Sequence, residues 1–346
     1  MPRMASQKGK TDMTRHALTT YQASDSDEGF WRRPLSRRSL LSAALGVTGA
    51  ALLAGCSVPS SNEDSATPAA ADADSKLSVV ASFYAPYDFA TKVAGDHADL
   101  TNLTPAGTEP HDWEPAPTDM VTIQNADLLV YNGANMEHWV DDLLASLGDK
   151  APATVKASDG ITLRQGSEED NGDSTDPHVW LAPKNAKHEL ANIRDALVKV
   201  DPDHADDYKA NYEKHASDLD ELDKEYSERL SQVPHKTIVV SHEAFGYLCD
   251  AYGLTQIPIT GMDAEGEPDA QTMASIIEQV KDQGVKTIFS EDLVSPKVAQ
   301  AIADATGATC EVLNPLEGLE QDDIDAGADY VSVMRDNLDK LVAALS

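Results

Sequence analysis

From residue 77 onward, short runs rich in β-branched and apolar residues alternate with segments of helical periodicity. This alternation is typical of parallel α/β units. It predicts two groups of four strands, over 77–82, 100–103, 128–131 and 154–156, and over 237–241, 255–259, 287–290 and 309–313. Helices are predicted over 86–93, 118–125, 137–147 and 183–200. The fold class is therefore α/β, with two lobes of parallel-sheet units.

A long helix is predicted between the two lobes, over 204–233. Its apolar and aromatic side chains recur at spacings of three and four, which places them on one helix face, namely Tyr208, Tyr212, His215, Leu219, Leu222, Tyr226, Leu230 and Val233. Thirty helical residues rise about 45 Å, so this helix is long enough to run along both lobes and join them stiffly. His215 is interpreted as a packed histidine of this stripe and not as a ligand.

Residues 1–55 are interpreted as an export signal, because 40–54 are apolar or small and follow Arg37 and Arg38. Fifteen helical residues span roughly 22 Å, which is short of the ~30 Å hydrocarbon core, so a permanent span is not expected. The sequence Leu-Ala-Gly-Cys at 53–56 resembles a lipobox and predicts lipidation of Cys56, with residues 56–76 as a flexible tether. The arginine pair suits a twin-arginine signal or an ordinary secretory one, and both alternatives stay open.

The charge balance excludes some partners. Residues 1–55 hold eight basic and four acidic residues, so 19 basic and 55 acidic residues remain and the mature net charge is 36 negative. Nucleic acid and anionic lipid both require a partner of the opposite, positive charge.

The length after the tether predicts two domains, with a first lobe at 77–200, a linking helix at 201–234 and a second lobe at 235–346. Cys249 and Cys310 either form a disulfide or remain two separate thiols.

Four polar side chains follow strands of the predicted sheets. His111 and His178 follow the second and fourth strands of the first lobe, and His242 and Glu291 each follow a strand of the second lobe. Ligands of open α/β sheets bind beyond the carboxyl ends of the strands, so the four are expected to converge on the interlobe cleft. Asp292 competes with Glu291, and either carboxylate alternatively caps the helix predicted to start near residue 296.

Three imidazoles and one carboxylate suit tetrahedral coordination of one Zn²⁺ per chain. Mn²⁺ prefers a larger share of oxygen donors. A second layer of carboxylates is expected to accept hydrogen bonds from the metal-bound imidazoles, and the candidates near in sequence are Asp112, Glu114, Asp176 and Glu243.

Four ordered motifs carry a family resemblance: Gly-Thr-Glu-Pro-His-Asp-Trp-Glu-Pro at 107–115, Asp-Pro-His-Val-Trp-Leu at 176–181, Ser-His-Glu-Ala-Phe-Gly-Tyr at 241–247 and Leu-Asn-Pro-Leu-Glu at 313–317. Over residues 77–346 the chain resembles the zinc-type solute-binding lipoproteins of bacterial metal-ion ABC importers (cluster A-I). The resemblance implies two α/β lobes bridged by a rigid helix, with His111, His178 and His242 as zinc ligands and Glu291 as the fourth. Manganese-type relatives carry a carboxylate at the position of His242. Many zinc-type members also have a histidine-rich acidic loop, whereas residues 168–173 here are acidic without histidine.

The resemblance implies a function without catalysis. The chain is expected to capture zinc with high affinity at the outer face of the cytoplasmic membrane, as a lipid-anchored monomer, and to deliver it to an ABC permease and its ATPase. One alternative is a manganese or iron carrier of the same family. Another is a zinc hydrolase, although the chain has no His-Glu-x-x-His helix and a fourth protein ligand closes the coordination sphere. A third is a surface adhesin, a role assigned to some family members.

Overall fold

The computed structural model describes residues 76–166 and 175–346. The predicted export signal lies outside the described residues, as do Cys56, the tether apart from its last residue, and the acidic segment 168–173. Within the described part, no helix combines the length and the apolar character that a membrane span requires.

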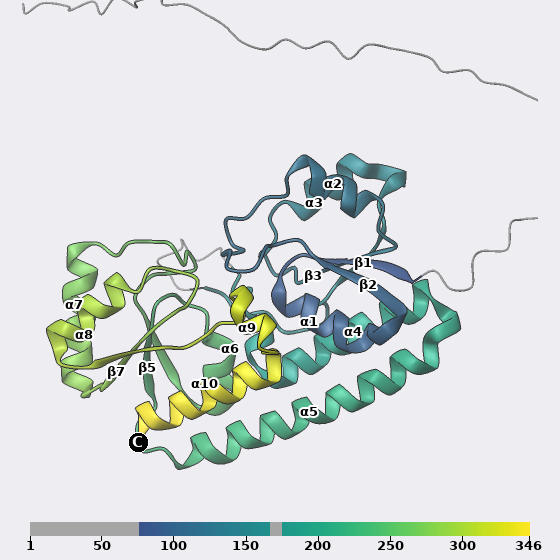
Figure 1. Ribbon diagram of the computed structural model, residues 1–346. Helices are drawn as coiled ribbons and strands as arrows, with labels where there is room; N and C mark the ends of the chain where they lie inside the picture. The colour runs from purple at the N-terminus through teal and green to yellow at the C-terminus, as the bar shows by residue number, and fades with distance from the viewer. Residues whose placement is uncertain (1–75, 167–174) are drawn as a thin grey trace, which may run out of the picture. The chain divides into compact units, whose positions relative to one another are not determined.

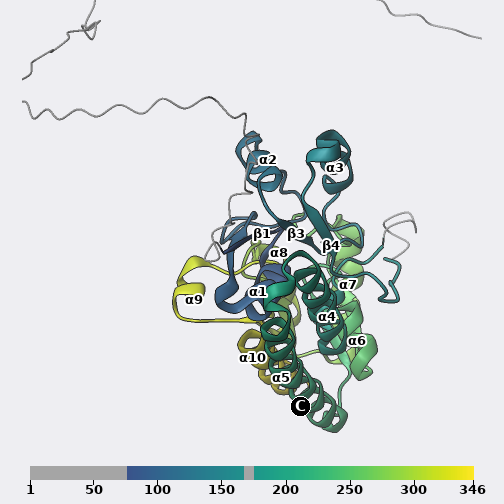
Figure 2. The same cartoon turned by 90° about the vertical axis from the view of Figure 1, so that its right-hand side faces the viewer.

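The first lobe contains a four-stranded parallel sheet in the order β2-β1-β3-β4. Its strands are β1 (Leu77–Ala81), β2 (Ala98–Asn102), β3 (Leu128–Tyr131) and β4 (Ala153–Lys156). The helices of this part of the chain are α1 (Tyr84–Ala94), α2 (Pro117–Gln124), α3 (Val140–Leu147) and α4 (Pro183–Val200). Figure 2 shows α2 and α3 on one side of the sheet and α1 and α4 on the other. Helices therefore cover both faces, as parallel sheets require.

The second lobe repeats this topology with a parallel sheet in the order β6-β5-β7-β8. Its strands are β5 (Thr237–Val240), β6 (Thr255–Pro258), β7 (Thr287–Ser290) and β8 (Thr309–Val312). The helices are α6 (Gly246–Tyr252), α7 (Ala270–Gln283), α8 (Lys297–Thr306), α9 (Gln321–Asp325) and α10 (Tyr330–Leu345). The predicted fold class is confirmed, and each predicted strand lies within two residues of an observed one. The lobe boundaries chosen from the sequence stay a prediction.

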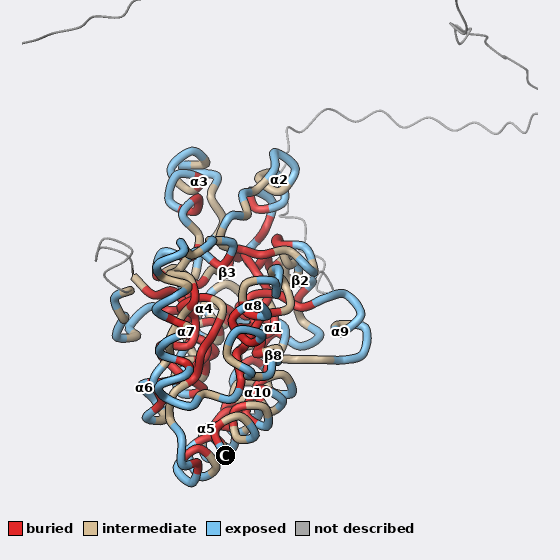
Figure 3. The backbone as a smooth tube through the Cα atoms, turned by 90° about the vertical axis from the view of Figure 1, so that its left-hand side faces the viewer, coloured by how far each residue is buried: buried red, intermediate tan, exposed pale blue. Residues whose placement is uncertain are grey.

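Alternate residues of the central strands enter different cores. In β5, Ile238 and Val240 belong to the main core, whereas Val239 belongs to a smaller core under α7 and α8. This alternation follows from the two-residue period of a strand. The main core is continuous from the first sheet to the second, and Figure 3 shows buried residues in the interior and the largely exposed α9 at the surface.

The cysteines lie on opposite faces of the second sheet. Cys249 on α6 packs in the main core, and Cys310 on β8 packs against the smaller core of the other face. Both are free thiols, so the predicted disulfide alternative is wrong, because the sheet itself separates the two side chains.

The linking helix is α5 (Ala205–Gln232), whose 28 residues rise about 42 Å. It contacts α1 and α4 and also α6 and α10, so it runs along both lobes (Figure 1). Its buried face is the predicted stripe, including Tyr208, Leu219, Leu222, Tyr226 and Leu230. Together with the continuous core, this rod favours small relative movements of the lobes over wide hinge opening.

Candidate metal centre

The four side chains that meet between the lobes come from loops beyond the carboxyl ends of strands. His111 lies in the loop after β2, and His178 precedes the short 3₁₀ turn Val179–Leu181 that leads into α4. His242 follows β5 by two residues, and Glu317 follows β8 by five. Because parallel strands end at one edge of each sheet, and the two edges face each other, residues far apart in sequence converge here.

The donor atoms of this group are close together. Nε2 of His178 lies 3.2 Å from Nε2 of His111 and 3.1 Å from Nε2 of His242. Oε1 of Glu317 lies 2.8 Å from His178, 3.1 Å from His242 and 3.3 Å from His111, measured to Nε2 in each case. Donors at about 2.0–2.1 Å from a tetrahedral Zn²⁺ are separated from one another by about 3.3 Å. The arrangement therefore approaches the edges of a zinc coordination tetrahedron.

Carboxylates on the Nδ1 side of His178 and His242 fix the tautomers of these two histidines. Nδ1 of His178 lies 2.9 Å from Oδ1 of Asp176, and Nδ1 of His242 lies 2.8 and 2.9 Å from the two oxygens of Glu291. An ionised carboxylate only accepts hydrogen bonds, so each Nδ1 carries a proton. In the neutral rings both Nε2 atoms then present lone pairs toward Glu317. Lone pairs that converge in this way require protons or a metal cation between them.

Glu291 is not a member of the donor group, and the position predicted for it is wrong. Both of its oxygens face Nδ1 of His242, and it also accepts a hydrogen bond from the His242 backbone N–H at 3.2 Å. It therefore lies on the far side of the imidazole from the converging Nε2 atoms. Asp292, the alternative, accepts from the Asn314 side chain at 2.6 Å and also lies outside the group.

Glu317 takes the place expected for Glu291. Its side chain is only 1% exposed, and it stands at the end of the Leu-Asn-Pro-Leu-Glu motif that follows β8. The rule that selected the other four candidates, a polar residue beyond the carboxyl end of a strand, applies to it equally. The signal for Glu317 in the sequence is therefore the motif itself, whereas Glu291 stands closer to the end of a strand.

Of the four carboxylates predicted as partners of the metal-binding imidazoles, Asp176 accepts a hydrogen bond from the ring of His178. Its Oδ1 accepts from Nδ1 and from the backbone N–H of His178, the latter at 3.0 Å. Its Oδ2 faces the guanidinium of Arg164 at 3.3 Å. The same guanidinium pairs with Asp250 on α6, so a residue of the first lobe bridges to the second. Gly246 makes room for this contact, because an added Cβ would lie 2.5 Å from Nε of Arg164.

The titration behaviour of the metal-free site follows from burial and charge. Burial lowers the pKa of His178, but Asp176 and Glu317 outweigh it and raise the pKa above its ordinary value. Burial also lowers the pKa of His242, which Glu291 and Glu317 then raise well above the ordinary value. Burial raises the pKa of Glu317, yet His242 and His111 hold it well below its usual range. Without a metal, the site thus favours the protonated forms of His178 and His242 beside an ionised Glu317, and a metal cation competes with those protons.

Solvent reaches the donor group from one side. The His111 side chain is 15% exposed, whereas those of His178 and His242 are fully buried. Backbone contact between the lobes closes part of the rim, since the N–H of Gly107 donates to the carbonyl of Leu319 at 3.0 Å. His111 is therefore the histidine of the donor group that is open to solvent.

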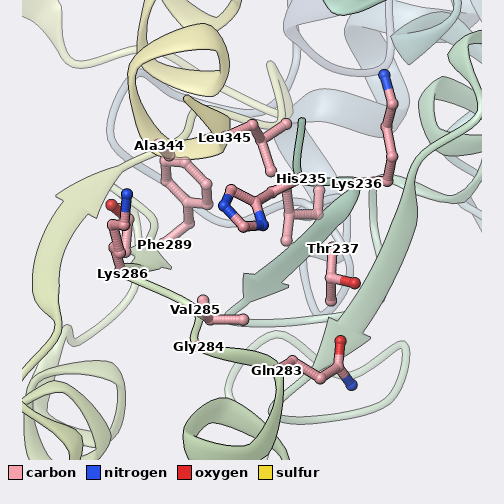
Figure 4. Close-up of a pocket in the computed structure, with 12 residues that line it drawn as sticks. His235, Lys236, Thr237, Gln283, Gly284, Val285, Lys286, Phe289, Ala344 and Leu345 are labelled. Carbon is pink, nitrogen blue, oxygen red and sulfur yellow. The ribbon is translucent and has the colours of Figure 1, made fainter. Parts of the chain in front are cut away.

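A separate small pocket lies at the other end of the second sheet, beside the first residues of β5 and β7. His235, Lys286, Phe289 and Leu345 are among the residues that line it (Figure 4). The residues lining it include none of the four donors. The histidine in this pocket is thus unrelated to the metal centre.

The fold and the donor group define a class, the two-lobed α/β metal-binding proteins that hold an ion between two parallel sheets. The chain belongs to the family described as ZnuA, zinc-uptake complex component A, periplasmic, whose model matches residues 79–344. The resemblance found from the four motifs is thereby confirmed.

Two relatives illustrate the similarity in sequence. The high-affinity zinc uptake system protein ZnuA of Bacillus subtilis is 41% identical over 293 residues, which cover 82% of this chain and 92% of that protein. The zinc-binding lipoprotein AdcA of Streptococcus pneumoniae is 40% identical over 279 residues, which cover 78% of this chain. The match spans only 56% of the length of AdcA.

Solved structures agree with this assignment. The Zn(II)-bound ZnuA-like domain of Streptococcus pneumoniae AdcA is 39% identical, with a TM-score of 0.70 and coverage of 78% of this chain and 99% of that one. The laminin-binding protein Lmb of Streptococcus agalactiae, described as bifunctional with adhesin and metal-transporting activity, is 35% identical, with a TM-score of 0.73 and coverage of 79% and 100%.

Proposed function

We propose that this chain captures Zn²⁺ between its lobes and delivers it to the membrane permease of an ABC importer. The observation that carries the proposal is the convergence of three imidazole Nε2 atoms and one carboxylate oxygen, with five of the six donor pairs at 2.8 to 3.3 Å and all four donors within 4.8 Å of one another. Family membership supports the same function, and relatives are named for zinc uptake and zinc binding.

The proposed ligands are His111, His178, His242 and Glu317. Three neutral nitrogen donors and one oxygen suit zinc better than manganese, which prefers more oxygen. Four protein ligands complete a tetrahedron and leave no position for a reactive water, so the site favours capture and release over hydrolysis. The two second-layer carboxylates orient the imidazoles before the ion arrives, which reduces the cost of ordering them.

The place of action follows from the proposed export signal. Lipidation of Cys56 would anchor the mature chain outside the cytoplasmic membrane, and residues 56–76 would let the lobes reach a permease. A permease that recognises the zinc-bound arrangement of the lobes needs only a small difference between the bound and free states, because recognition depends on differential affinity for the two.

Calorimetric titration of the chelator-stripped protein tests the proposal. We expect one tightly bound Zn²⁺ per chain, much weaker binding in His111→Ala, and displacement of bound Mn²⁺ by Zn²⁺. Absence of tight binding, or binding that His111→Ala leaves unchanged, would defeat it. Hydrolysis of ester or peptide substrates by the zinc-loaded protein would revive the enzymatic alternative.

Adhesion is the second candidate function, because the structure is similar to Lmb, whose description includes adhesin activity. A deletion strain separates the two. Zinc capture predicts poor growth in zinc-poor medium with attachment to laminin intact, whereas adhesion predicts lost attachment that zinc does not restore.

A further inference from the structure

The residue before Glu317 has an unusual backbone conformation. Leu316 is fully buried and has a φ of 59°. The left-handed region is unfavourable for a residue with a branched side chain, since its Cβ crowds the backbone. Such a conformation persists only where the surroundings impose it. The loop 313–317 must therefore be held by contacts that outweigh this cost.

Those contacts come from two asparagines. Oδ1 of Asn314 accepts a hydrogen bond from the backbone N–H of Leu316 at 2.6 Å, which closes the turn. Asn314 is itself held by Asn337 on α10, whose Oδ1 accepts from the Asn314 backbone N–H at 3.0 Å and whose Nδ2 donates to the Asn314 carbonyl at 2.7 Å. One side-chain amide thus satisfies both backbone groups of the residue that shapes the turn.

Asn337 stands in a setting where an amide is otherwise unfavourable. It is fully buried, on the face of α10 that also carries Met334, Leu338 and Leu341 in the main core. A buried amide without partners is costly, whereas one that satisfies a buried backbone is stabilising. The pair of hydrogen bonds to Asn314 therefore accounts for a polar residue in this position.

The first lobe also holds this loop. Nε1 of Trp180, two residues after His178, donates to the carbonyl of Pro315 at 2.8 Å. The stretch before Glu317 is thus held both by α10 and by the first lobe. Trp180 is close in sequence to His178, whereas Asn337 is far in sequence from His111, His178 and His242.

We propose that Asn337 is a positioning residue of the metal centre, which fixes Asn314 so that the left-handed Leu316 directs the Glu317 carboxylate at the three imidazoles. The inference rests on the proposed function and adds to it an explanation of how Glu317, the one carboxylate of the donor group, is positioned. It makes the charge and the coordination number of the site depend on α10, a helix that contributes no ligand to the donor group.

A double-mutant cycle tests this inference. Asn337→Leu removes both hydrogen bonds and keeps the branched shape of the side chain, and Glu317→Ala removes the ligand. The matched control is Leu341→Ala, one turn further along the same buried face of α10. Zinc affinity is measured by competition with a chelating dye, and coordination by the visible absorption of the Co²⁺-loaded protein. Asn314→Ala removes the side-chain oxygen that accepts from the Leu316 N–H and closes the turn. It serves as a second variant if Asn337→Leu fails to fold.

We expect Asn337→Leu to weaken zinc binding about 10- to 100-fold, the range typical of residues that orient ligands. Its Co²⁺ spectrum should shift toward that of Glu317→Ala, and in the Glu317→Ala background it should cause no further loss. Leu341→Ala should lower the melting temperature but keep the wild-type spectrum. An equal loss with and without Glu317, or an unchanged spectrum, would overturn the role of Asn337. Failure of the wild-type protein to bind Zn²⁺ or Co²⁺ would overturn the proposed function and this inference together.

Discussion

Glu317 and Glu291 are both buried carboxylates beside the same histidine, and the structure predicts that their removal has different consequences. Oε1 of Glu317 lies within 3.3 Å of three imidazole nitrogens, whereas the oxygens of Glu291 lie beside Nδ1 and the backbone N–H of His242. Removing Glu317 takes the one negative charge out of the donor group. Removing Glu291 leaves the four donors in place and loses only the orientation of one ring.

The magnitudes follow from these positions. Deleting one partner of a buried charge interaction costs about 3–5 kcal/mol, so Glu317→Ala should weaken zinc binding by roughly two to four orders of magnitude. Loss of a carboxylate that orients a metal-bound histidine typically costs about 10- to 100-fold, which is the expectation for Glu291→Ala. The order of the two effects depends only on which carboxylate faces the ion.

Zinc affinities from chelator competition, with Co²⁺ absorption as the report on geometry, distinguish the two variants. Glu317→Ala should change the Co²⁺ bands because a ligand is exchanged, and Glu291→Ala should bind more weakly with bands close to those of the wild type. A larger loss in Glu291→Ala, together with a changed spectrum, would refute the placement of Glu317 in the donor group.

Three further predictions concern the surroundings of the donor group. Arg164→Met should weaken zinc binding about tenfold, measured by the same competition, because Asp176 loses the cationic partner of its Oδ2 and orients His178 less firmly through its Oδ1. Gly246→Ala should lower the free energy of unfolding by about 1–3 kcal/mol in urea denaturation, because the added Cβ collides with that ion pair. The metal-free protein should lose stability as the pH rises above about 6.5, since the pKa values of His178 and His242 are raised in the folded state and their stabilising protons are then lost. The rise in melting temperature on adding zinc should therefore grow over the same pH range.

Each of these has an outcome that contradicts it. Arg194→Met, which removes an arginine stacked on Tyr212 away from the site, serves as the control for Arg164→Met and should leave zinc affinity unchanged. Equal losses of zinc affinity in Arg164→Met and Arg194→Met would show that the ion pairs of Arg164 do not support the metal centre. An unchanged unfolding free energy in Gly246→Ala would show that the neighbouring side chains move aside. A metal-free melting temperature that rises with pH above 6.5 would reverse the assigned direction of the histidine pKa values.

The architecture was predictable from the sequence because its central strands are buried on both faces and its long helix carries a single apolar stripe. These patterns can be recognised in short segments of the sequence. Once the strands are known, their carboxyl ends indicate where a binding site forms. The three histidines were accessible to the same reasoning, since each follows a strand and is flanked by rigid or motif residues. Convergence of side chains from both lobes is a consequence of the topology and needs no knowledge of individual contacts.

The fourth member of the group was not predictable in this way. Glu291 and Glu317 both follow strands, and the difference between them is which nitrogen of His242 each one faces. That difference depends on the left-handed turn at Leu316 and on hydrogen bonds from α10, which are set by residues far away in the sequence. The disulfide alternative failed for a related reason, because a cysteine count does not show which face of a sheet each thiol occupies.

Anomalous diffraction at the zinc absorption edge, from crystals of the zinc-loaded protein, tests the central claim most directly. The account predicts one strong peak per chain, about 2.0–2.1 Å from Nε2 of His111, His178 and His242 and from a carboxylate oxygen of Glu317. A peak coordinated by Glu291 in place of Glu317, or no peak between the lobes in protein that has been saturated with zinc, would contradict it.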